Sequence, residues 1–296
     1  MTDDPFVTHR SLLFTIAYEM LGSAADAEDV VQETWLRWAA RNESDDQEEV
    51  REPRAYLVRM VTRQALNRVR TLARRREDYV GEWLPEPLLT TPDVAEDVEL
   101  AESVSLAMLT VLETLSPTER AVFVLREVFE VPYDEIAAAV EKTPAAVRQI
   151  AHRARERVSA RRPRIQVDRT EQEQVVQRFL DALVTGDVQG LLDVLAPDVA
   201  LVADGGGVVS AVKIPLTGAD VVSRVLAMFA ERGPEGASVA PMVLNGAPAA
   251  RIDIAGVLDT AISVVVRDGR VTHVYAVRNP AKLARLGEET RLSRVG

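Results

Sequence analysis

The sequence predicts a multidomain protein in which two all-α units are followed by an α+β unit. Three observations lead to this prediction. Apolar residues recur at helical spacing through most of the first 160 residues. Strand-like runs separated by Asn-Gly and Asp-Gly turn signals follow from about Val199. The length of 296 residues suits two or three domains. The expected units are residues 1–76, a linker at 77–105, residues 106–163 and residues 164–296.

Composition limits the classes of function. The chain has no cysteine, and its three histidines (His9, His152 and His273) lie far apart. We therefore expect no disulfide, no metal site and no cofactor. The start MTDDPF is acidic, and no apolar run approaches the roughly 18 residues of a membrane helix. These features predict a cytoplasmic protein with no membrane partner.

The charge distribution favours a nucleic-acid partner in spite of a formal net charge of −11. Residues 51–76 hold nine arginines against one glutamate, and residues 142–164 hold eight basic residues against one glutamate. Acidic segments separate these two blocks. Because salt screens charges beyond about 8–10 Å, each block acts locally. Two compact basic blocks are typical of a protein that contacts DNA at two places.

An acidic helical face is expected within residues 8–40. The stretch DAEDVVQETWLRW places Asp29, Gln32, Glu33 and Leu36 on one side of a helix. An ordinary solvated acidic face remains the simpler interpretation of the spacing by itself.

A helix that begins at Pro53 is expected to carry two different faces. Its apolar stripe comprises Val58, Val61, Ala65, Val69 and Leu72. The opposite face carries Arg59, Arg63, Asn67, Arg70 and Arg74. No acid follows Glu52 until Glu77, so these arginines have no acidic neighbour one turn away. A solubilising basic face is the alternative, but the pattern favours contact with phosphates and bases.

The acidic segment at residues 77–102 is expected to be a linker. It contains nine acids and no lysine or arginine. The prolines of WLPEP and Pro92 oppose a regular helix there. An indole is most favourable when it is buried, so Trp83 indicates that the linker docks against another part of the chain.

Residues 106–160 have the layout of a helix-turn-helix unit. A capping box at 116–119 begins one helix, a short helix follows at about 133–140, and a third helix runs from 144 to about 160. Arg148 and Gln149 can read guanine and adenine edges in the major groove. The candidate DNA contacts are Lys142, Ala145, Arg148, Gln149, His152 and Arg153. His152 taken alone is more simply a plain surface residue.

Residues 164–296 alternate between helical and extended patterns. Helices are expected after a capping box at 170–173, up to about Leu195, and at 218–232. The expected extended segments are 199–203, 208–216, 239–244, 249–254, 257–266 and 270–278. The pattern predicts helices packed on a curved antiparallel sheet.

Four residues of this unit are candidate acids or bases, namely Asp204, Asp253, Asp259 and His273. The pattern contains no convincing acid–base pair among them, so we assign no catalytic residue and do not expect an enzyme. Whether a pocket of this unit holds a small-molecule ligand stays open.

The first half resembles the extracytoplasmic-function (ECF) sigma factors. DAEDVVQETWLRW resembles their polymerase-clamp-binding helix, RAYLVRMVTRQALNRVR their helix for the minus-10 promoter element, and residues 115–158 their minus-35 domain. The resemblance implies that core RNA polymerase contacts the acidic face and that promoter DNA contacts the two basic faces. Asn67 stands where the family usually has Asp, and Arg63 where it often has Asn.

The order of elements in the second half, together with TGDVQGLLDVLAPDVALVADGGG at 185–207, resembles the SnoaL-like branch of the nuclear-transport-factor-2-like fold, a cone with a pocket. With WLPEP at 83–87, DGGG at 204–207 and NPAKL at 279–283, nearly the whole chain resembles the SigJ-type subgroup. NPAKL differs from the subgroup's usual NPDKL at Ala281. The resemblance implies an alternative-sigma transcription initiation factor whose C-terminal extension regulates it in place of a separate anti-sigma protein.

We expect the linker to dock near the DGGG segment, because glycines allow close backbone approach. The expected regulatory contacts are Trp83, Leu84, Pro85, Asp204, Gly205, Gly206, Gly207, Asn279 and Pro280. A loose glycine loop is the alternative. Two other functions remain open: a helix-turn-helix regulator that does not replace a sigma subunit, and a SnoaL-like enzyme or ligand-sensing module fused to such a regulator.

Overall fold

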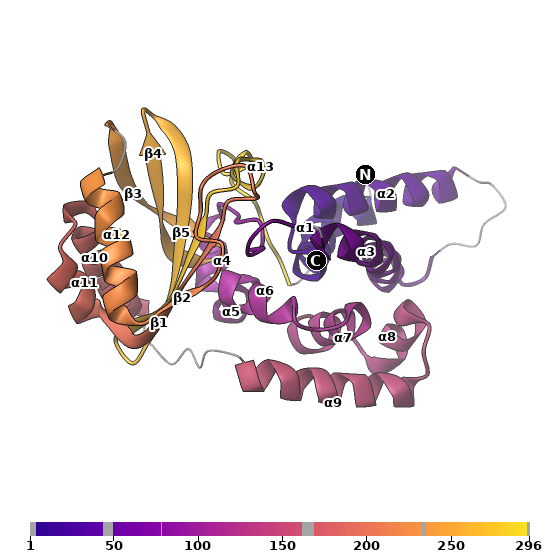
Figure 1. Cartoon of the computed structure of the whole chain (residues 1–296). Coiled ribbons are helices and arrows are strands. Elements are labelled where there is room, and N and C mark those ends of the chain that lie inside the picture. Colours follow the sequence, from indigo (N-terminus) through magenta and orange to yellow (C-terminus); the bar gives the residue numbers. More distant parts are fainter. Residues whose placement is uncertain (1–3, 44–49, 78, 162–168, 233–234, 295–296) are drawn as a thin grey trace.

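The computed structural model describes residues 4–43, 50–77, 79–161, 169–232 and 235–294. Two groups of helices lie on one side of the molecule, and helices packed on a sheet lie on the other (Figure 1). A short helical segment and an extended segment lie between the two sides. The predicted boundary between residues 163 and 164, which separates the helix-turn-helix unit from the C-terminal unit, lies outside the described residues, as does the side chain of Arg74.

Three helices form the first unit: α1 (Pro5–Leu21), α2 (Ala24–Asn42) and α3 (Pro53–Glu77). The side chain of Asp4 accepts a hydrogen bond from the Phe6 N–H and caps α1. Gly22 ends α1 in the left-handed region at a φ of 65°, where glycine is favoured. Ser23 then caps α2, so the continuous helical pattern of the sequence is divided into two helices.

The predicted linker contains more regular structure than its composition indicated. Its second half forms α4 (Pro92–Glu96) and α5 (Val98–Val104), and α6 (Leu106–Leu112) follows directly. The expectation of a helix-free linker was therefore wrong for residues 92–104. Pro92 takes the first position of α4, where a proline is tolerated, and the Asp97 side chain caps α5.

The second helical unit is the predicted helix-turn-helix. It comprises α7 (Pro117–Phe123), the π-helical turn η1 (Val124–Val128), α8 (Tyr133–Val140) and α9 (Pro144–Arg161). Ser116 and Glu119 form both hydrogen bonds of the capping box that begins α7. Glu141 adopts a left-handed φ of 57° and ends α8 just before the recognition helix α9.

The two helical units share one hydrophobic core. Buried side chains of α1, α2 and α3 join those of α5 to α9 in a single cluster. Leu13, Val61, Leu109, Val122 and Ile150 are representative members. The units are therefore packed against each other rather than held apart by the linker.

The C-terminal unit combines helices and a six-stranded sheet. Its helices are α10 (Arg169–Thr185), α11 (Val188–Val194), α12 (Ala219–Arg232) and the short α13 (Pro280–Leu283). Its strands are β1 (Leu195–Asp204), β2 (Leu216–Thr217), β3 (Ala237–Leu244), β4 (Ala247–Ile254), β5 (Val257–Arg267) and β6 (Arg270–Val277). The strand order is β2-β1-β6-β5-β4-β3. Helices α10, α11 and α12 cover one side of the sheet (Figure 1).

Two details of the predicted sheet were wrong. The sheet is mixed, because β1 and β6 pair in parallel. Short turns force β3, β4, β5 and β6 to be antiparallel, but no short turn fixes the direction of β1 relative to β6. The expected strand at 208–216 is a loop that reaches the sheet only at β2. Alternating apolar residues suggested a strand there, but Pro215 lacks the donor that a central strand needs.

The end of the described chain returns to the first helical unit, near α1 (Figure 1). Leu292 is buried in the shared helical core, and the Ser293 N–H donates to the Thr15 hydroxyl at 3.0 Å. The Arg294 guanidinium is 3.1 Å from the Asp97 carboxylate. Among the described residues, no helix has the length and hydropathy that crossing a bilayer requires.

Candidate nucleic-acid interface and interdomain junction

The predicted polymerase-binding residues lie together on α2. Asp29, Gln32, Glu33 and Leu36 are all exposed. Leu36 is 59% exposed, and the neighbouring Trp35, which the sequence argument did not single out, is 45% exposed. Large apolar side chains left in water beside acids are typical of a protein-binding face.

Asp29 also has a partner within the chain. The Arg68 guanidinium of α3 donates to Asp29 at 2.8 Å and to Asp26 at 2.7 Å. Arg68, which was not among the predicted minus-10 residues, therefore ties α3 to α2. No local pattern in the chain marks this role, because the two helices meet only through tertiary packing.

The predicted minus-10 face is split by its neighbours in the structure. Asn67 and Arg70 are exposed on α3, and Arg70 donates to the Asn67 amide oxygen at 3.4 Å. The Arg59 guanidinium lies 5.3 Å from the centre of the Tyr56 ring. Arg63 differs from these, since it is engaged by the other helical unit.

Arg63 connects the minus-10 helix to the helix-turn-helix. Its Nη2 donates to the Ala138 carbonyl at 2.9 Å and lies 3.6 Å from the Glu141 carboxylate. A hollow of about 450 Å³ between α3 and α8 is bordered by Arg59, Asp134 and Glu135. Acidic groups and a helix C-terminus of the second unit therefore lie against arginines predicted to contact DNA.

The predicted minus-35 residues form one exposed surface at the beginning of α9. The members are Lys142, Ala145, Arg148, Gln149, His152 and Arg153, all of them exposed. The Arg148 guanidinium lies 5.7 Å from the centre of the Tyr133 ring on α8. His152 Nε2 lies 3.6 Å from the Glu156 carboxylate. This surface has the position of a recognition-helix face in a helix-turn-helix protein.

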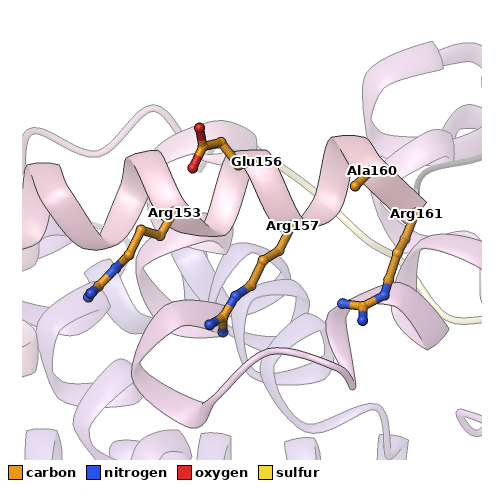
Figure 2. Close-up of a pocket in the computed structure, with 5 residues that line it drawn as sticks. All are labelled: Arg153, Glu156, Arg157, Ala160 and Arg161. Carbon is orange, nitrogen blue, oxygen red and sulfur yellow. The ribbon is translucent and has the colours of Figure 1, made fainter.

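A row of arginines continues along α9. Arg153, Arg157 and Arg161 extend from one side of the helix around a shallow hollow of about 610 Å³ (Figure 2). Arg157 donates to Glu119 at 2.7 Å, and Arg161 donates to the Thr114 hydroxyl at 3.2 Å. Burial would raise the pKa of Glu119, but hydrogen bonds from Ser116 and the charge of Arg157 lower it below its ordinary value. Arg157 and Arg161 thus hold α9 to the body of its unit.

Asp204 is the centre of a junction between the linker and the C-terminal unit. Its carboxylate is fully buried. It accepts hydrogen bonds from the Leu84 N–H at 2.9 Å, the Tyr79 hydroxyl at 2.6 Å and the Lys282 ammonium at 2.6 Å. Lys282 also donates to the Leu84 carbonyl, and its nitrogen lies 4.2 Å from the centre of the Trp83 ring. Burial and the Asp204 charge raise the pKa of Tyr79.

The glycines after Asp204 are required by close contacts. A Cβ on Gly206 would lie 2.4 Å from the Asn279 amide nitrogen, and one on Gly207 would lie 3.0 Å from Val80. Asn279 in turn donates to the Tyr79 hydroxyl at 2.8 Å. The structure thus brings together segments near residues 84, 204 and 279, which the sequence argument expected to meet.

The apolar part of the linker packs against both the first helical unit and the C-terminal sheet, and Leu84 belongs to the core of that sheet. Leu84 and Pro85 are buried, and Trp83 is half-buried. A Cβ on Gly22 would lie only 2.8 Å from the Trp83 ring. Glu86 accepts hydrogen bonds from the Ala24 N–H at 2.8 Å and the Ser23 hydroxyl at 3.2 Å, at the positive N-terminus of α2.

A second contact between the units was not foreseen. Asn245, in the turn between β3 and β4, is buried against the helical side. Its amide nitrogen donates to the Tyr18 hydroxyl at 2.7 Å and to the Val104 carbonyl at 2.8 Å, and its amide oxygen accepts from the Leu88 N–H at 2.9 Å. In the sequence, Asn-Gly signals only a tight turn, and nothing marks this turn as an anchor.

A buried polar cluster lies where the linker, α1 and α7 meet. The Glu19 carboxylate accepts a hydrogen bond from the Ser103 hydroxyl at 2.8 Å, and Arg120 donates to the Glu19 carbonyl at 2.8 Å. Burial raises the pKa of Glu19 to about 8 in spite of the Ser103 hydrogen bond. Burial also lowers the pKa of Arg120 to about 9.

The four candidate acids and bases lie in different environments. Only Asp259 borders the cavity of the C-terminal unit, and it is paired with Arg278 at 2.9 Å. Asp253 accepts from Arg251 at 2.8 Å, and the His273 ring is 5.9 Å from the ring of Tyr275. Asp204 belongs to the junction. Within the described part of the chain, no cluster of three His, Asp or Glu side chains could hold a metal ion.

Comparisons with known proteins agree with this arrangement. Residues 6–75 match the Sigma-70 region 2 family, and residues 105–158 match Sigma-70, region 4. The ECF RNA polymerase sigma factor SigJ of Mycobacterium tuberculosis is 36% identical over 290 residues, which cover 94% of this chain and 91% of the relative. The probable ECF sigma factor SigI of the same species is 31% identical, covering 95% of this chain and 94% of that protein.

A solved structure covers the same three units. The crystal structure of Mycobacterium tuberculosis SigJ matches with a TM-score of 0.75 and 33% sequence identity, over 95% of this chain and 97% of that chain. The two sigma regions coincide with the helical units, and the structural match extends through the C-terminal unit. This chain belongs to the ECF RNA polymerase sigma factors.

Proposed function

We propose that this alternative sigma factor grips core RNA polymerase through α2, reads its promoter through α3 and α9, and is controlled by its own C-terminal unit. The observation that carries this proposal is the junction at Asp204. The C-terminal unit binds the backbone of the linker that joins the two DNA-binding units, at Leu84 and again at Leu88. Whatever moves the junction therefore changes how the two DNA-binding units are held.

The exposed acidic and apolar face of α2 supports the assignment of polymerase contacts. Asp29, Gln32, Glu33 and Leu36 would meet a complementary basic and apolar surface on the polymerase. Arg68 would have to share Asp29 with that partner, since both groups lie at the edge of the same face.

The promoter contacts follow from charge and chemistry. Arg59, Asn67 and Arg70 would contact the minus-10 element, together with Arg63 once α8 has moved away. On α9, Arg148 and Gln149 would read base edges, while Lys142 and Arg153 would neutralise phosphates.

The packed arrangement of the two helical units supports a closed state of the free protein. The minus-10 and minus-35 elements lie about 25 base pairs apart, which is roughly 85 Å of duplex at 3.4 Å per pair. Helices α3 and α8 touch through Arg63 and Ala138. In this arrangement the two helical units cannot bind the minus-10 and minus-35 elements at the same time. Promoter binding would therefore require the two units to separate.

The C-terminal unit would act as a built-in regulator, with no need for a separate anti-sigma protein. The pairing of Asp259 with Arg278 and of Asp253 with Arg251 supports a regulatory rather than a catalytic unit, because neither carboxylate is poised as a general acid or base. The chain would act in the cytoplasm, where core RNA polymerase and promoter DNA are found.

Reconstituted transcription tests this function. Core polymerase would be combined with the full chain, with a chain ending at Pro163, or with full-length Asp204→Ala. We expect promoter-specific transcripts from the full chain and an altered yield from both variants, because both release the linker. Failure of the full chain and of the shortened chain to associate with core polymerase at low salt would refute the proposal.

A further inference from the structure

We infer that the cavity of the C-terminal unit binds a neutral, largely apolar small molecule, and that binding is coupled to the linker junction. This inference deepens the proposed regulatory role of that unit by naming the chemistry that would control it. Three observations carry it: the shape and lining of the cavity, an internally neutralised polar end, and a continuous path of contacts from the cavity to Asp204.

The cavity has the size and lining of a small-molecule site. Its volume is about 450 Å³, and it lies between α10, α12, the facing side of the sheet and the loop after β1. Apolar side chains make up most of its wall, including Leu183, Leu201, Leu226, Phe229, Ile252 and Ile262. Ligand sites in proteins typically have volumes of about 300–1,000 Å³ with mainly apolar walls and few polar groups.

The polar end of the cavity selects against charged ligands. Arg278 donates to Asp259 through Nε at 3.1 Å and through Nη2 at 2.9 Å, and the Thr260 hydroxyl donates to Asp259 at 2.6 Å. Burial would raise the pKa of Asp259, but these hydrogen bonds and the guanidinium charge lower it. Asp259 and Arg278 already neutralise each other. A ligand anion would therefore be repelled by Asp259 and a ligand cation by Arg278, and neither would find an unpaired counter-charge among these two groups. A neutral ligand with a hydroxyl or carbonyl group at this end avoids both costs.

The rim of the cavity offers an apolar entry. Val184 on α10 is 57% exposed and Phe229 on α12 is 48% exposed, and both border the cavity. Large apolar side chains at the mouth of an apolar cavity would be covered by a ligand that fills it, which adds a favourable transfer free energy to binding.

One path links the cavity to the junction through Arg278. Its side chain borders the cavity, and its backbone N–H donates to the Asp204 carbonyl at 2.7 Å. The same guanidinium donates to the Ser210 carbonyl, in the loop whose next residues, Ala211 and Val212, form part of the cavity wall. A ligand that displaces this wall would thus displace the residue that receives the linker.

A second path runs along the β3–β4 hairpin. Val239 and Ile252, on paired positions of the two strands, border the cavity. The hairpin ends at Asn245, which holds Tyr18 and Leu88. The attachments of the C-terminal unit to the linker at Leu84 and at Leu88 therefore both begin at walls of one cavity.

Fluorescence of the neutral dye N-phenyl-1-naphthylamine tests the site on the full-length protein. We expect saturable binding with blue-shifted emission. Ala276→Phe fills the cavity from β6, and Phe229→Asp places a charge at its rim on an exposed helical surface. Each is expected to weaken dye binding at least about tenfold. Ala160→Phe, which adds the same ring on exposed α9, is the matched control and should bind like the unmodified chain.

Three results would overturn the site. They are absence of saturable dye binding, unchanged affinity in both cavity variants, and equal or tighter binding of the anionic analogue 8-anilino-1-naphthalenesulfonate at the same site. Phe229→Asp lies on the surface and should leave the fold intact, so it remains informative if Ala276→Phe unfolds.

Reciprocal linkage tests the coupling. If the dye changes the stability of the junction, then breaking the junction must change dye affinity by the same factor. We expect Asp204→Ala to change the dye dissociation constant by about threefold or more, and the exposed Asp193→Ala to leave it unchanged. Equal affinity in the unmodified chain and Asp204→Ala would disprove the coupling. Because no polymerase is present, failure here would leave the proposed sigma function intact.

Discussion

The backbone N–H of Leu84 donates to the buried carboxylate of Asp204 at 2.9 Å, although the two residues are 120 positions apart in the sequence. Leu84 lies between the two DNA-binding units, and Asp204 ends β1 of the C-terminal unit. The Asp204 side chain therefore holds the linker backbone at Leu84, and Lys282 supplies the opposite charge beside it. Through this contact the linker is docked on the C-terminal unit. The position of the linker therefore depends on the conformation of that unit.

Asp204→Ala is expected to destabilise the chain by about 3–5 kcal/mol, because it leaves the Lys282 ammonium without its counter-charge in a buried site. Chemical denaturation would measure the change, and hydrogen exchange at Leu84 would show faster exchange. Asp193→Ala on the surface of α11 should change stability by less than about 0.5 kcal/mol. Equal stabilities of the two variants would contradict the role given to Asp204.

Gly22→Ala is expected to lower stability by roughly 2–5 kcal/mol, the sum of left-handed strain and a clash with the Trp83 ring. Gly256→Ala is the matched control. Gly256 has a similar φ of 79°, and no heavy atom outside Gly256 and its two chain neighbours lies within 4 Å of the added Cβ. It should cost only the roughly 1–2 kcal/mol of backbone strain. If both variants melt at the same temperature, Trp83 does not pack tightly on Gly22.

Locking α3 to α8 is expected to abolish promoter-specific transcription, since the two units must part to reach both elements. Ala55→Cys and Ala138→Cys border the hollow between these helices, and the chain has no other cysteine. A reducible bis-maleimide would join the two thiols, and cleavage of the linker should restore transcription. The singly substituted Ala55→Cys, treated in the same way, controls for modification. Full activity of the cross-linked protein would exclude the proposed closed state.

Arg148→Ala and Arg153→Ala should weaken promoter binding in different ways. Loss of a base-reading Arg148 is expected to cost about 1–3 kcal/mol and to relax the preference at one base pair. Loss of a phosphate-contacting Arg153 should weaken binding evenly across sequences and reduce the salt dependence by about one counterion. Holoenzyme binding to labelled promoter variants over a salt series measures both. An unchanged base preference in Arg148→Ala would remove it from the reading face.

Stability is expected to fall as the pH rises from 6.5 to 8, through Glu19. Its pKa is raised to about 8 in the folded chain and is near 4.5 when unfolded, so the folded state holds the extra proton in this range. Folding is then favoured at the lower pH, by roughly 1–2 kcal/mol over the window. The lowered pKa values of His9 and His273 act in the opposite direction, because the unfolded chain then binds more protons than the folded chain, and this effect fades as the pH rises above 6.5.

Glu19→Gln keeps an acceptor for Ser103 and removes the titrating group. Its thermal unfolding midpoint should therefore change less between pH 6.5 and 8 than that of the unmodified chain. Parallel pH profiles of the two proteins would show that Glu19 is not protonated in the folded state.

The fold class and the chain's family could be predicted from the sequence because their signals are local. Helical periodicity, the capping box at Ser116 and Glu119, and the spacing of Arg148 and Gln149 on α9 all depend on neighbours within a few positions. The structure has the predicted helices at 133–140 and from 144 onward with almost the same bounds. The two basic blocks and the acidic segments between them could also be identified from the sequence, because the charge of a segment does not depend on the fold.

The sheet was harder to predict, because strand pairing joins distant residues. Turn signals at Asn245-Gly246 and Asp268-Gly269 correctly indicated two hairpins. No local signal sets the direction of β1 beside β6, and the alternation at 208–216 imitated a strand. The prediction of a helix-free linker failed for a different reason. A proline disfavours the interior of a helix but is tolerated at its first position, where Pro92 begins α4.

By itself the sequence determined the helices, their basic and acidic faces and the family, because those follow from the order of neighbouring side chains. Only the tertiary structure decided that Arg63 lies against Ala138, that Asn245 anchors the linker, and that Asp204 holds Leu84. Such contacts arise because elements far apart in the chain pack together to bury apolar surface. Each polar group that is buried in this packing then forms a hydrogen bond with whichever partner the packing has placed nearby.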